Sequence, residues 1–155
     1  QLAKADFYNP VSQFVVKVTN PFLVPLRRII PGFAGIDWAG IVLVLIVSFL
    51  KLLIMQAIFG QGFPWVVLFI GSLLSVIDSA FMLVFWVTVI RALFSWISQG
   101  YNPVEALLHQ LTEPLLAPIR KIIPPIGGLD LSLLVFLVAL QFIKLNVQYF
   151  LKMFL

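Results

Sequence analysis

Residues 8–37 read YNPVSQFVVKVTNPFLVPLRRIIPGFAGID, and residues 101–130 read YNPVEALLHQLTEPLLAPIRKIIPPIGGLD. The two stretches align without a gap at an offset of 93 residues, and the alignment continues to residues 52 and 145. Over these 45 aligned positions 18 residues are identical, which indicates an internal duplication. We therefore expect two copies of one structural unit.

The composition places the chain in a membrane. Of its 155 residues 62% are apolar and 10% are charged, and the mean hydropathy is +1.11. Soluble domains have about 45–50% apolar and about 25% charged residues. This excludes a soluble enzyme, a disordered tail and a nucleic-acid-binding arm. Three stretches are long enough to cross a bilayer: Trp38 to Phe59, Phe81 to Ile97, and Leu131 to about Leu151.

A fourth apolar stretch, Trp65 to Ile77, has only 13 residues and is short for a crossing. It continues through Asp78 into the second span without a proline. We interpret residues 65–98 as one long helix, kinked or tilted. The alternative is a short interfacial helix followed by a separate span. Residues 60–64 form an uncharged turn before it.

Each copy also contains an amphipathic segment. Apolar residues recur there at the spacing of one helical face: Val11, Phe14, Val15, Val18 and Phe22 in the first copy, and Val104, Leu107, Leu108, Leu111 and Leu115 in the second. Such a helix lies in the plane of the membrane interface, with its apolar face against the acyl chains. Asn9 and Asn102, each followed by proline, are the predicted N-caps.

Further polar residues are predicted to begin helices. Thr19 and Thr112, each two residues before a proline, are expected to cap a second short helix in each copy. Asp37 and Asp130 stand at the starts of the following spans, where a carboxylate satisfies free backbone amides. An ion-binding or proton-binding role is the alternative for these two aspartates.

Both copies carry a basic pair, Arg27-Arg28 and Arg120-Lys121. We expect these side chains to contact lipid phosphates and to set the membrane orientation, with a specific partner or anion site as the alternative. The net charge of +4 fits this interpretation. The positive-inside rule places both basic loops in the cytoplasm, so the two copies share one orientation.

Four ionisable residues lie within the apolar stretches, where such residues are functional candidates. They are Lys51, Asp78, Arg91 and Lys144. The two lysines each stand at the fourteenth position of their span, so we expect them to snorkel or to pair with Asp78. A functional polar pair is the alternative. Arg91 lies close to the cytoplasmic end of its span and is expected to snorkel.

The second copy is preceded by the span Phe81 to Ile97, and the equivalent span of the first copy would fall before residue 1. We expect that a first transmembrane helix is missing from this chain. The predicted fold is an all-α integral membrane protein with one domain, residues 1–155. Repeat one covers residues 1–59, without its N-terminal helix, and repeat two covers residues 65–155. Each repeat comprises a transmembrane helix, in-plane amphipathic helices and a second transmembrane helix.

The motifs duplicated between the spans are Asn-Pro, Thr-x-Pro, Pro-x-Arg-[Arg/Lys]-Ile-Ile-Pro and Gly-[Ile/Leu]-Asp. They resemble those of the YggT family, called YlmG in other bacteria and in plastids, over nearly the whole chain. The resemblance implies a small multi-pass protein of the bacterial inner membrane or of a plastid membrane. It also implies a role in osmotic or ion homeostasis, in division or in the assembly of cytochrome complexes.

Enzymatic function is the weakest interpretation. The chain has no cysteine and a single histidine, His109, which we place in an interfacial helix. Gly60-Gln61-Gly62 lacks the third glycine of a dinucleotide-binding loop. We therefore expect no catalytic residue, cofactor or metal. A structural, assembly or regulatory subunit of an inner-membrane complex is favoured, and an oligomeric ion channel or transporter is the alternative. The expected partners are bilayer lipids with anionic head groups and another inner-membrane protein or further copies of the chain, but not nucleic acid.

Overall fold

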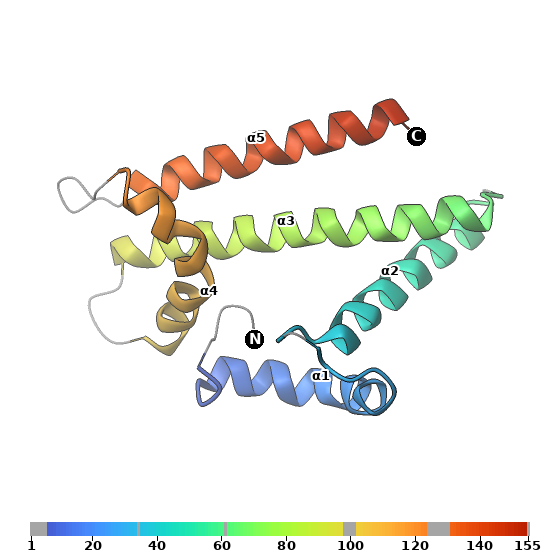
Figure 1. Cartoon of the computed structure of the whole chain (residues 1–155), viewed down its shortest axis with the longest axis horizontal. Helices are drawn as coiled ribbons and strands as arrows, with labels where there is room; N and C mark the ends of the chain where they lie inside the picture. The colour runs from blue at the N-terminus through green and yellow to red at the C-terminus, as the bar shows by residue number, and fades with distance from the viewer. Residues whose placement is uncertain (1–5, 34, 61, 98–101, 124–130, 155) are drawn as a thin grey trace. The chain divides into compact units, whose positions relative to one another are not determined.

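The computed structural model describes residues 6–33, 35–60, 62–97, 102–123 and 131–154 as five α-helices and their flanking loops (Figure 1). The helices are α1 (Pro10–Ile29), α2 (Trp38–Phe59), α3 (Trp65–Ile97), α4 (Pro103–Arg120) and α5 (Leu131–Phe154). Within these ranges no β-strand forms, and an isolated bridge joins Phe33 to Ile36 in the loop before α2. The predicted all-helical class is confirmed.

Three of the helices, α2, α3 and α5, are long and apolar enough to cross a bilayer. Helix α2 has the predicted bounds, and α5 begins at the predicted Leu131. Helix α3 runs without interruption from Trp65 to Ile97, a length of 33 residues. The interpretation of this region as one long helix is therefore confirmed, and the separate short helix does not form.

The described chain falls into two compact units, and the division lies inside α3 after Ala80. The first unit contains residues 14–80, which include most of α1, all of α2 and the first half of α3. The second unit contains the segment that leads into α1, the second half of α3, and helices α4 and α5. Each unit is described by itself below.

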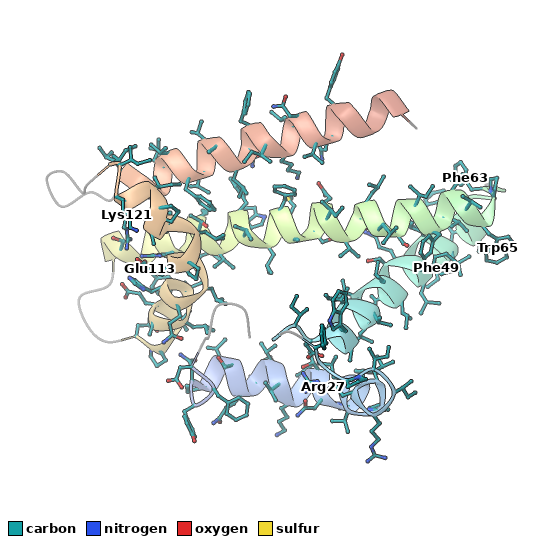
Figure 2. All side chains as sticks on the ribbon, viewed as in Figure 1. Arg27, Phe49, Phe63, Trp65, Glu113 and Lys121 are labelled. Carbon is teal, nitrogen blue, oxygen red and sulfur yellow. The ribbon has the colours of Figure 1, made fainter. Side chains whose placement is uncertain are left out.

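In the first unit, α2 approaches the first half of α3 through small side chains. A methyl group added at Gly71 would lie 3.3 Å from Cδ1 of Leu52, so the missing side chain permits this approach. Ser72 is buried, and its hydroxyl donates a hydrogen bond of 2.7 Å to the carbonyl oxygen of Phe69. The rings of Phe49 and Trp65 stack with their centroids 6.5 Å apart (Figure 2).

In the second unit, α4 is packed against its neighbours. Leu108, Thr112 and Leu116 of α4 are buried, and they lie one turn apart on a single face. Helix α5 contributes buried Ser132 and Leu133 beside this face of the unit. By contrast, α1 has no buried residue between Pro10 and Ile29. The two amphipathic helices therefore differ in how much of their surface the protein covers.

The prediction that Thr19 and Thr112 cap second short helices is wrong. Both residues lie inside continuous helices, and each hydroxyl donates a 2.8 Å hydrogen bond to the carbonyl oxygen four residues earlier. The prolines that suggested a new helix lie inside α1 and α4. A proline within a helix removes one backbone hydrogen bond and can bend the helix without ending it. The Thr-x-Pro pattern is therefore not a helix start here.

Candidate functional site

Arg91, near the C-terminal end of α3, is a charged side chain that the protein buries almost completely. The side chain is 6% exposed. Its Nη1 donates a hydrogen bond to Oγ1 of Thr112, and its Nη2 lies 3.3 Å from Oε2 of Glu113. Snorkelling of Arg91 to the interface stays a prediction, and in the structure α4 supplies two acceptors directly beside its guanidinium group.

Glu113 of α4, which Figure 2 labels, is shared by several basic side chains. Nη1 of Arg120 donates to both of its carboxylate oxygens, at 2.9 and 2.8 Å. Nε2 of His109, one turn earlier, lies 3.5 Å from Oε2. We call Arg91, His109, Thr112, Glu113 and Arg120 the Arg91 cluster. Two arginines thus share the carboxylate of Glu113.

The Arg91 cluster fastens α4 to a membrane-spanning helix. A buried guanidinium group is costly unless it is paired and hydrogen-bonded, and both requirements are met here. The hydroxyl of Thr112 accepts from Arg91 and donates to the carbonyl oxygen of Leu108, so both its proton and a lone pair are used. The arrangement therefore acts as an electrostatic clamp between α3 and α4.

Sequence reasoning missed Glu113, although a signal was present. Glu113 stands four residues after His109 and seven before Arg120, which is the spacing of neighbours on one helix face. It also replaces Asn20 of the first copy, so it is a charge found in one duplicated loop and not in the other. A new carboxylate between basic residues indicates a local ion-pair network.

In the first unit, Arg27 is paired with Asp37 (Figure 2). Nε of Arg27 donates to Oδ2 of Asp37 at 3.1 Å, and Nη2 donates to the same oxygen. Oδ1 of Asp37 accepts from the amide of Gly40 at 3.2 Å and so caps the N-terminus of α2. The hydrogen bond from Arg27 holds the pKa of Asp37 below its usual range, and the same bond raises the pKa of Arg27.

The duplicated basic pairs share one arrangement in the structure. The first member of each pair, Arg27 or Arg120, is bonded to a carboxylate. The second member, Arg28 or Lys121, has an exposed side chain, and Lys121 is also the C-cap of α4. Each pair thus divides into an internal contact and an outward-facing cation.

Asp130, the fourth predicted aspartate or asparagine cap, lies outside the described residues.

The two predicted asparagine caps have equivalent hydrogen bonds. Oδ1 of Asn9 accepts from the amide of Val11, and Oδ1 of Asn102 accepts from the amide of Val104, both at 2.9 Å. Nδ2 of Asn9 also donates to the carbonyl oxygen of Pro103 at 2.6 Å. The start of α1 is therefore attached to the first turn of α4.

The remaining ionisable residues in the apolar stretches have different surroundings. Lys51 on α2 is exposed, whereas Asp78 on α3 and Lys144 on α5 are half-buried. Pairing of Asp78 with either lysine stays a prediction. In the part of the chain that the structure describes, no three His, Asp or Glu side chains are grouped to hold a metal ion.

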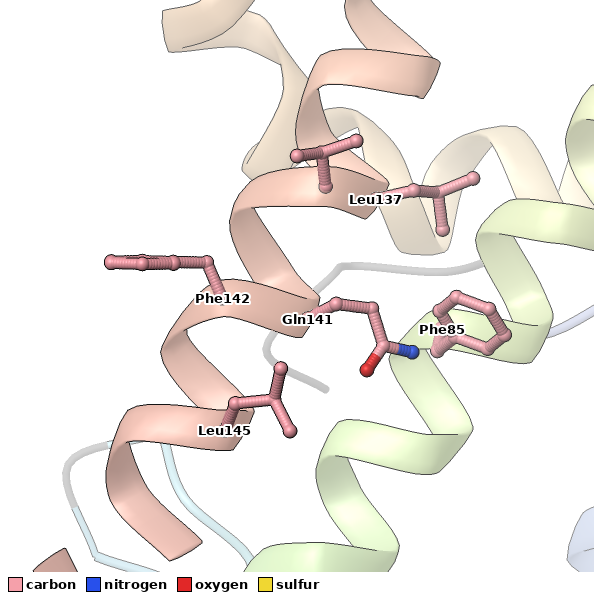
Figure 3. Close-up of a pocket in the computed structure, with 6 residues that line it drawn as sticks. Phe85, Leu137, Gln141, Phe142 and Leu145 are labelled. Carbon is pink, nitrogen blue, oxygen red and sulfur yellow. The ribbon is translucent and has the colours of Figure 1, made fainter. Parts of the chain in front are cut away.

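An open groove of about 460 Å³ runs between the second half of α3 and α5 (Figure 3). The residues that line it are apolar with one exception: Phe85, Leu137, Val138, Gln141, Phe142 and Leu145. Figure 3 shows the amide of Gln141 directed toward the ring of Phe85. The groove exposes an apolar surface within the length of two membrane-spanning helices.

A family model described as CCB3/YggT matches residues 2–58 and 70–151. The chain belongs to the CCB3/YggT family. This confirms the resemblance that the Asn-Pro, Thr-x-Pro and Arg-Ile-Ile-Pro motifs indicated.

Several bacterial relatives of this CCB3/YggT chain are similar along most of their length. The "uncharacterized protein in proC 3'region" of Vibrio alginolyticus is 53% identical over 145 residues, which cover 92% of this chain and 78% of the relative. The "uncharacterized protein YggT" of Escherichia coli strain K12 is 42% identical over 147 residues, which cover 95% and 77%. A Pseudomonas aeruginosa protein is 43% identical over 150 residues, which cover 95% and 76%. A search of solved structures finds no match.

Proposed function

We propose that this CCB3/YggT-family chain is a non-enzymatic structural, assembly or regulatory subunit of an inner-membrane complex. The observation that carries the proposal is how little of the three spans the chain covers. In the most apolar 18-residue stretch of each helix, the fraction of residues buried inside the protein is 0% for α2, 11% for α3 and 11% for α5. Such surfaces need lipid or the helices of a partner protein.

The architecture we propose is a parallel duplication with both basic loops in the cytoplasm. Helices α1 and α4 begin 93 residues apart, and so do α2 and α5. The family model matches two separate stretches, and each contains one of the duplicated loops. The Arg91 cluster would then hold α4 at the cytoplasmic surface, available to a partner. A setting in osmotic or ion homeostasis belongs to the same proposal.

The test is the recovery of partners from the native membrane. The full-length protein would be purified in mild detergent after crosslinking, and co-purifying proteins would be identified by mass spectrometry. A single stoichiometric membrane partner is the expected result. Charge reversal at Lys121, whose side chain is exposed, should reduce its recovery if the basic loops form the interface. Recovery of the chain alone, or of its own oligomer only, would contradict the subunit proposal.

An ion channel or transporter is the second candidate, and one observation favours it. Lys51 and Lys144 occupy equivalent positions of α2 and α5, at the fourteenth residue of each helix. Ionisable residues at membrane depth often mark ion pathways. The pure protein in liposomes should then support ion flux, and replacement of both lysines by leucine should abolish it. Absence of flux from a folded, oriented preparation would exclude this candidate.

A further inference from the structure

Within the part of the chain that the structure describes, helix α1 presents an exposed apolar face. Phe14, Val18 and Phe22 are 67%, 53% and 63% exposed, and their spacing of four residues places them along one side of the helix. Ile29, at the end of the same side, is 78% exposed. Exposed large apolar side chains in a continuous row mark a contact surface. In a chain with three apolar spans, the acyl boundary of the bilayer is the environment that such a row fits.

Two cations lie together along one edge of this face. The two residues, Lys17 and Arg28, stand eleven positions apart, a spacing that on a regular helix places both on one side, roughly a quarter turn from the row of apolar side chains. Both side chains are exposed. Their aliphatic stems can lie along the apolar edge while the charged ends reach the head groups. Between Pro10 and Ile29 the sequence contains no acidic residue, so nothing within the helix neutralises them.

The third cation of α1, Arg27, is engaged elsewhere. It is bonded through Nε and Nη2 to Asp37, and its charge is balanced by that carboxylate. Lys17 and Arg28 are therefore the cations of α1 that remain for a ligand outside the protein.

Helix α4 provides a comparison within the same chain. Gln110 stands at the position of Lys17, and its Oε1 accepts a hydrogen bond of 2.7 Å from the amide of Asp6. Helix α4 also contains two acidic residues, Glu105 and Glu113, at positions where α1 has Ser12 and Asn20. The equivalents of Val18 and Phe22 in α4, Leu111 and Leu115, are also exposed, at 38% and 42%. The two helices therefore differ mainly in charge, because α1 has Lys17 where α4 has Gln110 and has no acidic residue.

We propose that α1 is a docking surface for anionic phospholipids of the bilayer, selected by Lys17 and Arg28, and that α4 lacks this selectivity. The occupant follows from the charge complementarity between the cationic edge and an anionic head group, together with the apolar row that accepts the acyl chains. The inference rests on the proposed placement of α1 in the membrane interface. It adds a chemical class of ligand and assigns it to one of the two duplicated helices.

The experiment uses the absence of cysteine from the sequence. Val18→Cys would be labelled with a fluorophore in the full chain, reconstituted into vesicles of phosphatidylcholine and phosphatidylglycerol. Quenching by spin-labelled phosphatidylglycerol and by spin-labelled phosphatidylcholine gives the ratio of their binding constants at α1. A surface cation contributes about a fivefold preference for anionic lipid, so the ratio should fall about fivefold for each of Lys17→Gln and Arg28→Gln.

Matched variants distinguish an effect of the lost charge from an effect on the structure of the helix. Lys17→Gln installs the residue that α4 carries at the equivalent position, so it is compatible with this type of helix. The charge-conserving pair Lys17→Arg and Arg28→Lys should keep the ratio of the parent protein. Lys121→Gln removes a cation from α4 and should leave the ratio at the α1 label unchanged.

Three results would overturn the proposal. Equal quenching by both lipids in the parent protein would show that α1 does not select anionic lipid. Quenching by aqueous iodide in place of either lipid would show that this face does not contact the bilayer, and protection from both would indicate a protein on it. None of these results depends on the recovery of a partner, so they are distinct from a failure of the subunit proposal.

Discussion

Replacing Glu113 by glutamine should destabilise the protein more than removing the arginine it neutralises. In Glu113→Gln, Arg91 stays buried with a neutral amide and the hydroxyl of Thr112 as its acceptors. In Arg91→Met, Glu113 keeps both contacts with Arg120, and Thr112 still donates to the carbonyl oxygen of Leu108. The first change removes a carboxylate from beside a buried guanidinium group, whereas after the second change Glu113 and Thr112 keep these hydrogen bonds.

The magnitudes follow from burial and from the partners that remain. Breaking a buried ion pair costs about 3–5 kcal/mol when the charge left behind is unpaired. The carboxylate of Glu113 is 36% exposed, and the remaining hydrogen bond to Thr112 offsets part of the loss, so we expect about 2 kcal/mol for Glu113→Gln. Methionine fills much of the arginine volume, so Arg91→Met should cost about 1 kcal/mol or less.

The assay is reversible unfolding of the purified protein in detergent, followed by tryptophan fluorescence. For a chain of this size, 1 kcal/mol corresponds to about 2–4 °C in Tm, so Glu113→Gln should lower Tm by about 4–8 °C and Arg91→Met by less than about 4 °C. The double variant should be no less stable than Glu113→Gln alone, because the buried charge that lost the carboxylate is gone. A larger loss for Arg91→Met than for Glu113→Gln, or additive losses in the double variant, would refute the clamp.

Four further substitutions test individual side-chain contacts of the helices. Asn9→Ala removes a buried cap and the bond to Pro103, and should lower the free energy of unfolding by about 1–2 kcal/mol in the same assay. Thr112→Ala should cost about 1–2 kcal/mol, whereas Thr19→Ala, at the half-buried equivalent position, should cost less than about 0.5 kcal/mol, and a reversed order would contradict the packing difference. The folded-state pKa of Asp37 lies below its unfolded value, so its contribution is present above pH about 4 and is lost as the pH falls through the folded-state pKa. Asp37→Asn should therefore flatten the acid side of the stability profile, as measured by unfolding between pH about 3 and about 6.

Helix positions were largely predictable from the sequence because they depend on local chemistry. Asn9 and Asn102 each precede a proline in the first helical turn, and Asp37 stands directly before an apolar run. The sequence therefore contains a capping residue at each of these helix starts. The bounds of α2 follow from the apolar run between Asp37 and Gly60, and Gly60 ends the helix in the left-handed conformation with a φ of 65°.

The contacts that position charges were not predictable in the same way. Arg91 and Glu113 are 22 residues apart, and they meet because α4 folds back onto α3. Apolar periodicity places α4 in the interface but does not say which span covers its inner face. The Thr-x-Pro motif led to a wrong prediction for a related reason. A threonine two residues before a proline occurs at the start of a helix, but it also occurs inside a helix that continues through the proline.

The length of α3 has a mechanical consequence. At 1.5 Å per residue, its 33 residues extend about 50 Å, whereas the hydrocarbon core of a bilayer is about 30 Å thick. Even at a tilt of about 40°, the upper end of the usual range, the helix spans about 38 Å along the membrane normal. One end must therefore emerge from the core. A thicker bilayer favours a more upright α3, and because Arg91 bonds α3 to α4, the depth of α4 follows that tilt. The ion pair between α3 and α4 would thus make the position of α4 at the membrane surface depend on bilayer thickness.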